Sequence, residues 1–176
     1  MPSSVPRKPI SPSSRSMDLV RRHCQDILDS EGMRIERRCI QHGTTTVFAH
    51  SLSVTRQCVR LARSWRIPVD ERALLRGALL HDYFLYDWHD PDPSHRLHGF
   101  RHPGFACANA IRDFGIGPIE QNMVRRHMFP LTPMPPSCRE AALLCLADKM
   151  VATSETLDGF WLRLRAGLGA SVRDDA

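Results

Sequence analysis

The sequence lacks the features of a membrane-spanning, secreted or disulfide-bonded protein. No window approaches the roughly 18 consecutive apolar residues that a membrane helix requires. The first residues are basic and rich in serine and proline, without the apolar segment of a secretion signal. The six cysteines are scattered and include no CxxC pair, so neither a zinc ribbon nor a disulfide framework is expected. We therefore expect a cytoplasmic protein with reduced thiols and no membrane partner.

Negative charge is scarce at the N-terminus, which accounts for most of the net charge of +5. Residues 1–22 contain five basic side chains against Asp18 alone. A basic arm of this kind, without interleaved aromatic residues, is typical of a solvated tail rather than a nucleic-acid grip. We predict that residues 1–14 form a disordered basic tail, and we do not expect a nucleic-acid partner.

Strand patterns are also missing, because apolar and polar residues nowhere alternate long enough to predict a sheet. Apolar residues recur instead at helical spacing, and 176 residues suit a single core. The predicted helices span residues 17–30, 46–65, 70–86, 103–114, 118–128 and 137–156, with a weaker one over 158–168, and residues 87–101 form a loop. The fold class is therefore all-α, a single-domain bundle of about six to seven helices over residues 15–170.

Polar side chains interrupt the apolar faces of four predicted helices. His81 and Asp82 fall on the inner face of the helix over 70–86, and Asp148 lies in the middle of the inner face of 137–156. His50 and His127 continue the apolar faces of two further helices. A buried, unpaired carboxylate costs several kcal/mol out of the roughly 5–15 kcal/mol that stabilises a domain. A divalent cation would compensate two such carboxylates; buried Asp–Arg pairs are the alternative, and no arginine is expected on these faces.

The order and context of these residues resemble the HD-domain metal-dependent phosphohydrolases, whose pattern is H…HD…D on a helical bundle. The resemblance covers residues 44–156 and includes the segments FAHSLSVTRQCVRLA, GALLHD, RHPGFACANAI, RRHMFP and LCLADKMVA. A subset of that family has two further histidines, which His102 and His127 match. The resemblance implies one or two divalent ions (Fe, Mn, Zn, Mg, Co or Ni), the first on His50, His81, Asp82 and Asp148, the second on Asp82, His102 and His127.

The resemblance implies hydrolysis of a small phosphorylated substrate, a nucleotide-like phosphate monoester or phosphodiester, by a metal-activated water. The candidate catalytic residues are Asp82, Lys149 and Arg126, the last two as cations that neutralise phosphate charge. The loop histidines His89, His95 and His98 are rival metal ligands, but they lie on no buried face, so solvated positions or substrate contacts are expected; His89 and His98 are the candidate substrate-binding residues. Two alternatives stay open: a di-iron oxygenase with the same ligands, and a nucleotide-binding sensor without turnover. The oligomeric state is open as well.

Overall fold

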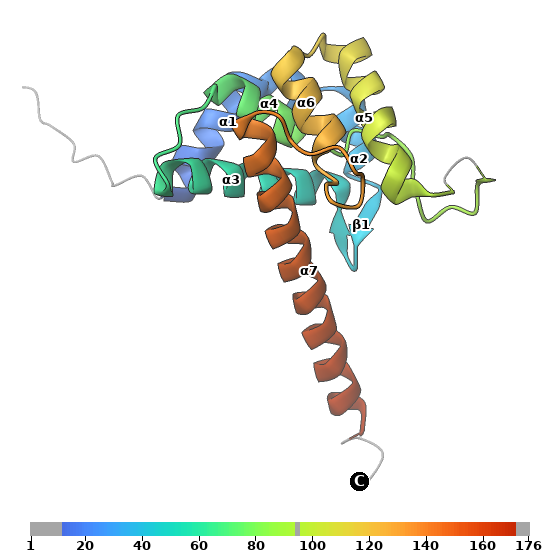
Figure 1. Cartoon of the computed structure of the whole chain (residues 1–176). Helices are drawn as coiled ribbons and strands as arrows, with labels where there is room; N and C mark the ends of the chain where they lie inside the picture. Colours follow the sequence, from blue (N-terminus) through green and yellow to red (C-terminus); the bar gives the residue numbers. More distant parts are fainter. Residues whose placement is uncertain (1–11, 94–95, 172–176) are drawn as a thin grey trace, which may run out of the picture.

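The structure is a computed structural model that describes residues 12–93 and 96–171, and it is built almost entirely from helices (Figure 1). The helices of the described residues are α1 (Pro12–Leu28), α2 (Glu31–Glu36), α3 (Val47–Ser64), α4 (Glu71–Leu79), α5 (His98–Phe114), α6 (Pro118–Arg126) and α7 (Arg139–Ser171). The predicted all-α class is confirmed. One small exception is an antiparallel hairpin of β1 (Ile40–His42) and β2 (Thr45–Thr46), which the sequence did not predict because its strands are too short to show alternation.

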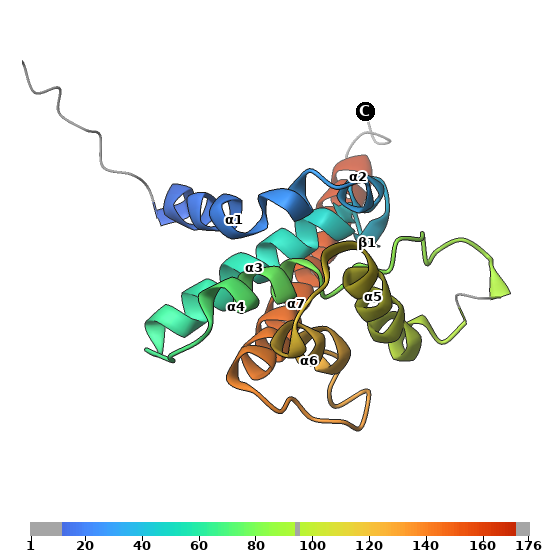
Figure 2. The same ribbon diagram turned by 90° about the horizontal axis from the view of Figure 1, so that it is seen from above.

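Helix α3 is the central element of the fold. It begins where predicted, because the Thr46 hydroxyl accepts a hydrogen bond from the backbone N–H of Ala49 at 3.2 Å and caps the first turn. Its inner face, with Val54 and Cys58, is fully buried against α4 and α7. In the view from above, α1 lies on one side of α3 and α6 on the other (Figure 2). The helices around α3 therefore point side chains toward one shared interior.

Helix α4 begins as predicted but ends early. The Asp70 carboxylate accepts from the N–H of Ala73 at 2.9 Å, which fixes the start. The helix was predicted to continue to residue 86, yet it ends at Leu79 and a turn follows. The Nδ1 atom of the His81 imidazole forms a hydrogen bond with the carbonyl of Ala78 at 2.8 Å. In a longer helix this carbonyl would accept a hydrogen bond from the N–H of Asp82. The His81–Asp82 pair therefore lies in the turn after the helix.

Helix α5 begins earlier than predicted. The predicted start was residue 103, but the backbone N–H groups of Phe100 and Arg101 already bond to the carbonyl of Leu97, at 2.9 and 3.1 Å. His98 consequently lies in the first turn of α5 and not in the preceding loop. The end is as predicted, at Gly115, whose positive φ of 58° suits glycine at a helix C-terminus.

Helix α6 starts at Pro118 as predicted and ends two residues before the predicted Met128. Helix α7 joins the two predicted helices over 137–156 and 158–168 into one, because only Gly159 interrupts the pattern and one glycine costs about 1 kcal/mol. Figure 1 shows α7 running far beyond the other helices. The Glu140 carboxylate of α7 accepts from the N–H of Asp70 at 2.9 Å and ties α7 to the start of α4.

The N-terminal region departs from the sequence prediction in two ways. Helix α1 begins at Pro12 instead of residue 17 and leaves helical geometry at Cys24, where φ is −133°. The short helix α2 was missed, although Ser30 caps it by accepting from the N–H of Met33 at 3.2 Å. The rest of the predicted tail, residues 1–11, lies outside the described residues. Within the part of the chain that is described, no helix has both the length and the apolar character needed to cross a bilayer.

Candidate metal centre

Six predicted ligands from five parts of the fold meet at one place. They are His50 of α3, His81 and Asp82 of the turn after α4, His102 of α5, His127 directly after α6, and Asp148 of α7. All except Asp148 are buried, and the Asp148 side chain is only 13% exposed. The structure thus brings together every residue that the sequence singled out as a metal ligand.

The two carboxylate oxygens of Asp82 face two different groups of histidines. Oδ2 lies 3.4 Å from Nε2 of His81 and 3.9 Å from Nε2 of His50. Oδ1 lies 3.2 Å from Nε2 of His102 and 3.5 Å from Nε2 of His127. The clusters of His50, His81 and Asp82 and of Asp82, His102 and His127 each keep one potential ligand atom per residue within 4.8 Å of the others. Asp82 is the member that both clusters share.

Asp148 completes the first of these clusters. Its Oδ1 lies 3.1 Å from Nε2 of His50 and 3.7 Å from Nε2 of His81. One side of the centre therefore has two imidazoles and two carboxylates, and the other side has two imidazoles and the shared Asp82.

Backbone carbonyls fix the tautomer of three of the histidines. Nδ1 of His81, His102 and His127 lies 2.8, 2.9 and 2.7 Å from the carbonyls of Ala78, His98 and Val124. Because a carbonyl only accepts, each Nδ1 carries the hydrogen, and each neutral ring presents the Nε2 lone pair to the centre. The pattern is local to the chain, since each carbonyl belongs to a residue three or four positions earlier.

His50 is oriented differently, by a carboxylate that the sequence analysis missed. Its Nδ1 lies 2.9 Å from Oε2 of Glu155, and its Nε2 faces Asp148. Glu155 follows Asp148 by seven residues on α7, so both lie on one helix face; that spacing was the signal available in the sequence. Gln41 of β1 was missed too, and its side-chain N–H donates to Oδ2 of Asp82 at 2.7 Å.

The pKa values of several side chains in the centre are shifted far from their ordinary values. Burial opposes a charge on His50, but hydrogen bonds to Asp148 and Glu155 outweigh it and raise the pKa of His50 to about 10. Burial, reinforced by the positive charge of neighbouring histidines, lowers the pKa of His127 to about 3. Burial alone would raise the pKa of Asp82, yet the surrounding imidazoles, His81 foremost, hold it well below its usual range.

One further buried carboxyl adjoins the centre. Glu36 of α2 is 1% exposed, and neither of its oxygens has a hydrogen-bond partner. Burial, followed by the negative charge of Asp82, raises the pKa of Glu36 well above its usual value. Sequence reasoning missed this residue because a single glutamate near the end of a short helix shows no distinguishing pattern.

Two observations indicate that the centre fits a divalent cation. Nε2 of His81 and Oδ1 of Asp82 are buried without a hydrogen-bond partner. Nε2 of His102 and Nε2 of His127, both lone-pair atoms in the neutral rings, are 2.9 Å apart. Two imidazole nitrogens at about 2.1 Å from one ion lie roughly 3–3.4 Å from each other. Divalent cations in the two clusters, one on His81 and one on His102 and His127, would satisfy all four of these atoms.

The alternative of buried Asp–Arg pairs does not apply to this centre. Arg76 of α4 is only 4% exposed, but it follows Leu74 by two residues and so lies on the opposite side of the helix from the face that leads to His81 and Asp82. Its guanidinium bonds to Asp26 Oδ1 at 2.7 Å and to the carbonyl of His23 at 3.1 Å. Asp82 and Asp148 are therefore partnered by histidines and not by this arginine.

A cavity of about 750 Å³ opens onto the centre. The two predicted catalytic cations differ in their position relative to this cavity. Lys149 lines the cavity, with Nζ donating to the carbonyls of His127 and Cys145 at 3.0 and 3.3 Å. Arg126 does not line it; its guanidinium donates to the carbonyl of Pro135 at 3.1 Å. Adjacent helical residues point about 100° apart, so His127 faces inward and Arg126 does not. Arg126 therefore does not face the centre in this geometry, and a catalytic role for it stays a prediction.

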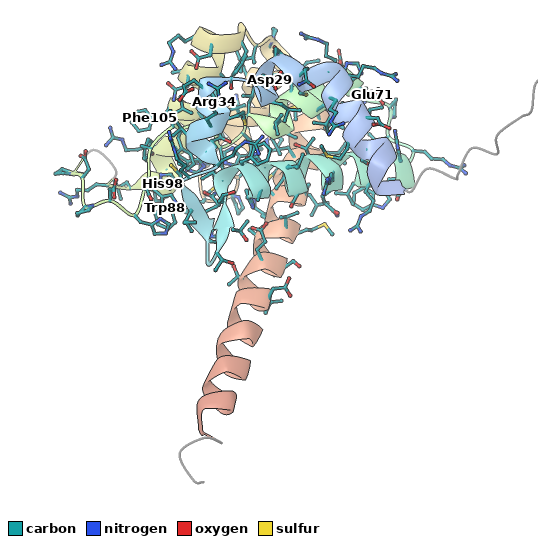
Figure 3. The ribbon with its side chains drawn as sticks, turned by 180° about the vertical axis from the view of Figure 1, so that it is seen from behind. Asp29, Arg34, Glu71, Trp88, His98 and Phe105 are labelled. Carbon is teal, nitrogen blue, oxygen red and sulfur yellow. The ribbon has the colours of Figure 1, made fainter. Side chains whose placement is uncertain are left out.

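The predicted substrate-binding histidines occupy different positions. His98 lines the cavity; its ring stacks on His102 at 4.6 Å and on Trp88 at 5.2 Å, and its Nδ1 lies 2.9 Å from the Tyr86 hydroxyl. Figure 3 shows Trp88 and His98 close together. His89 is exposed beside Trp88 and lines a neighbouring depression instead. His95 lies outside the described residues.

Comparison with known proteins gives one match. The family model for the HD domain matches residues 47–153, a segment that includes all six residues of the centre. No curated protein and no solved structure matches the chain.

Proposed function

The chain belongs to the HD domain family, and on this premise we propose that it is a metal-dependent hydrolase of a phosphate ester. The observation that carries the proposal is the orientation of the Asp82 carboxylate, whose Oδ1 and Oδ2 atoms face different imidazole Nε2 atoms. A carboxylate that lies between two groups of imidazoles could hold a pair of divalent ions, which is the requirement of two-metal hydrolysis.

The proposed first ion takes its ligands from α3, the turn after α4, and α7, and the second from the same turn, α5 and the end of α6. The ligand sets are His50, His81, Asp82 and Asp148 for the first, and Asp82, His102 and His127 for the second. Two divalent ions bound there would supply a water of lowered pKa and polarise the phosphoryl oxygens.

The surrounding residues set the orientation and charge of the ligands. Gln41 donates to Asp82 Oδ2 at 2.7 Å and limits rotation of the shared carboxylate. Glu155 holds the outer nitrogen of His50, and a carboxylate in that position makes an imidazole a stronger ligand. These contacts fix the ligands before substrate enters, which is the main protein contribution in centres of this kind.

Lys149 is the proposed cation for the phosphoryl group. It lines the cavity beside Asp148, and two backbone carbonyls hold its ammonium in place. A fixed positive charge near the phosphoryl oxygens stabilises the charge that develops in the transition state. Arg126 has no part in the proposed mechanism because it does not line the cavity and its guanidinium donates to the carbonyl of Pro135. The proposed partner is a small phosphorylated molecule, with nucleotides among the candidates.

The test is release of phosphate by protein purified without chelator and then loaded with each candidate metal. Phosphate release from a panel of phosphate esters supports the proposal. Lys149→Met should lower kcat/KM by about 10–100-fold, the loss expected for a hydrogen bond to a charged group, with metal content unchanged. Arg126→Met is the matched control and should keep wild-type kinetics.

Two outcomes would contradict the proposal. Oxygen consumption by the iron-loaded protein without phosphate release from any ester would identify an oxygenase with the same ligands. Tight nucleotide binding without turnover under every metal would identify a sensor.

A further inference from the structure

The cavity at the metal centre is charged at one end and apolar along its walls. Asp82, Asp148, His102 and His127 form the charged end. The walls include Trp88, Met128, Pro130, Leu131 and Ala152. A volume of about 750 Å³ is within the range of small-molecule sites, roughly 300–1,000 Å³. The cavity is therefore much larger than a phosphoryl group at its charged end requires, and the rest of a bound molecule would contact mostly carbon atoms.

The apolar wall includes a leucine that the fold itself does not bury. Leu131, in the segment between α6 and α7, is 47% exposed and lines the cavity. It packs near the start of α5, where a Cβ added to Gly99 would lie 3.2 Å from Leu131 Cδ2. Exposed apolar surface inside a cavity is typical of a surface that a ligand covers.

Trp88 and His98 supply ring surface to the same walls. Their rings stack at 5.2 Å with an angle of 14°, and His98 stacks in turn on the ligand His102. Aromatic rings favour apolar and aromatic neighbours in offset or edge-to-face contact. This part of the cavity suits a flat ring better than a hydrated sugar or a second phosphoryl group.

Cationic side chains are few at this site. Of the described residues that line the cavity, Lys149 is the one lysine, and none is an arginine. With two divalent ions and Lys149 opposite Asp82, Asp148 and Glu155, the net charge would be about +2, which balances one phosphate monoester dianion. Each further phosphoryl group adds negative charge that needs more cations or bidentate arginines.

We infer that this site takes a substrate with a single phosphoryl group on a compact, largely apolar and ring-containing organic group, and that it disfavours polyphosphates. The inference rests on the proposed function, because it places the phosphoryl group at the metal centre. Aryl phosphates have this chemistry, whereas nucleoside monophosphates place a hydrated sugar between the phosphoryl group and the ring, and nucleoside triphosphates carry two further phosphoryl groups.

The experiment measures binding and turnover side by side, so that the inference and the proposed function fail separately. The metal-loaded protein receives phenyl phosphate, glycerol phosphate, a nucleoside monophosphate and the matching triphosphate. Calorimetry gives Kd and phosphate release gives kcat/KM. Phenyl phosphate should exceed glycerol phosphate and the triphosphate by about tenfold or more in both measurements, a difference of the size that apolar contacts provide. The monophosphate, whose sugar lies between the phosphoryl group and the ring, should rank below phenyl phosphate and above the triphosphate.

Paired variants test the apolar wall directly. Leu131→Lys places a cation in the cavity, so the preference for phenyl phosphate over the triphosphate should fall by about tenfold or more. Met134→Lys is the control, because Met134 lies in the same segment, is 58% exposed and does not line the cavity; it should leave the preference within about twofold of wild type.

Three results would overturn the inference: equal or better binding of the triphosphate, equal binding of glycerol phosphate, or the same change in both lysine variants. Absence of phosphate release from every ester, with the binding preference intact, would overturn the proposed function and leave the inference standing.

Discussion

His102 and His127 face each other through their Nε2 atoms, 2.9 Å apart, while the Nδ1 atom of each ring is bonded to a carbonyl of the chain. Both Nδ1 atoms carry hydrogen, so in the neutral rings two lone pairs face one another. This arrangement is unfavourable without a proton or a cation between the rings. It gives the second proposed metal position a physical basis that is independent of the family match.

Loss of either of these histidines should remove one ion and leave the other. We expect His102→Ala and His127→Ala to bind about one metal ion fewer per chain, and to lose activity by orders of magnitude with the fold intact. His127→Ala also opens a cavity in a buried region, which costs about 1–3 kcal/mol, so a thermal melt accompanies each metal analysis. If both variants keep the wild-type metal content and lose only stability, these histidines are core residues and the centre holds a single ion.

Metal binding at the first position should release a proton at pH 7. The pKa of His50 is raised to about 10, so the metal-free ring carries a proton on both nitrogens below that pH. A metal at Nε2 displaces one of them, and the apparent affinity of the first ion should rise with pH up to about 10. Calorimetry in two buffers of different ionisation enthalpy measures the number of protons. Binding of the first ion without proton release at pH 7 would contradict this account of His50.

The same raised pKa sets the pH dependence of the metal-free fold. Because the pKa of His50 is higher in the folded protein than its ordinary value of 6.5, its contribution to stability is complete below about pH 6.5. That contribution is lost as pH rises toward about 10.

Glu155→Gln should weaken the first ion without removing it. Glutamine can still hold the ring, but it removes the negative charge that strengthens His50 as a ligand. Changes at such positions typically cost about 10–100-fold in metal affinity. Competition with a chelator of known affinity measures the effect, and Glu155→Asp should recover part of it. An unchanged affinity in Glu155→Gln would show that Glu155 has only a structural role.

Glu36→Gln should stabilise the metal-free protein at neutral pH. The pKa of Glu36 is raised in the folded state. Its ionisation therefore does not lower the free energy of unfolding below the ordinary pKa of 4.5, and lowers it increasingly as pH rises above that value. The gain in melting temperature from Glu36→Gln should therefore be larger at pH 7 than at pH 4. Glu31→Gln, at an exposed position of the same helix, is the control and should change stability by about 0.5 kcal/mol or less. Destabilisation at pH 7 would show that the Glu36 carboxyl makes a needed contact.

Five of the six ligand positions could be found in the sequence because each one interrupts the apolar face of a predicted helix, whereas His102 was identified only through the family resemblance. Asp148 stands among buried residues of α7, and no local reason explains a carboxylate there. The same reasoning could not find Gln41, which reaches Asp82 from a strand of three residues. It also could not tell that the guanidinium of Arg126 points away from the centre, because the contact with the carbonyl of Pro135 leaves no pattern in the sequence.

Helix limits were predictable where a side chain caps the backbone locally. Thr46 and Asp70 fix the starts of α3 and α4 through hydrogen bonds to residues three positions ahead. The end of α4 was not predictable, because it depends on the hydrogen bond between the His81 ring and the carbonyl of Ala78, and the position of that ring belongs to the metal centre. The site therefore determines part of the secondary structure around it.

The metal content of Asp82→Ala tests the central claim most directly, because Asp82 is the residue that the two proposed positions share. Protein purified without chelator or metal-affinity tag should contain about two ions per chain, and Asp148→Ala should keep about one. Asp82→Ala should contain close to none while remaining folded by circular dichroism. Full metal occupancy in Asp82→Ala would contradict the shared-carboxylate centre.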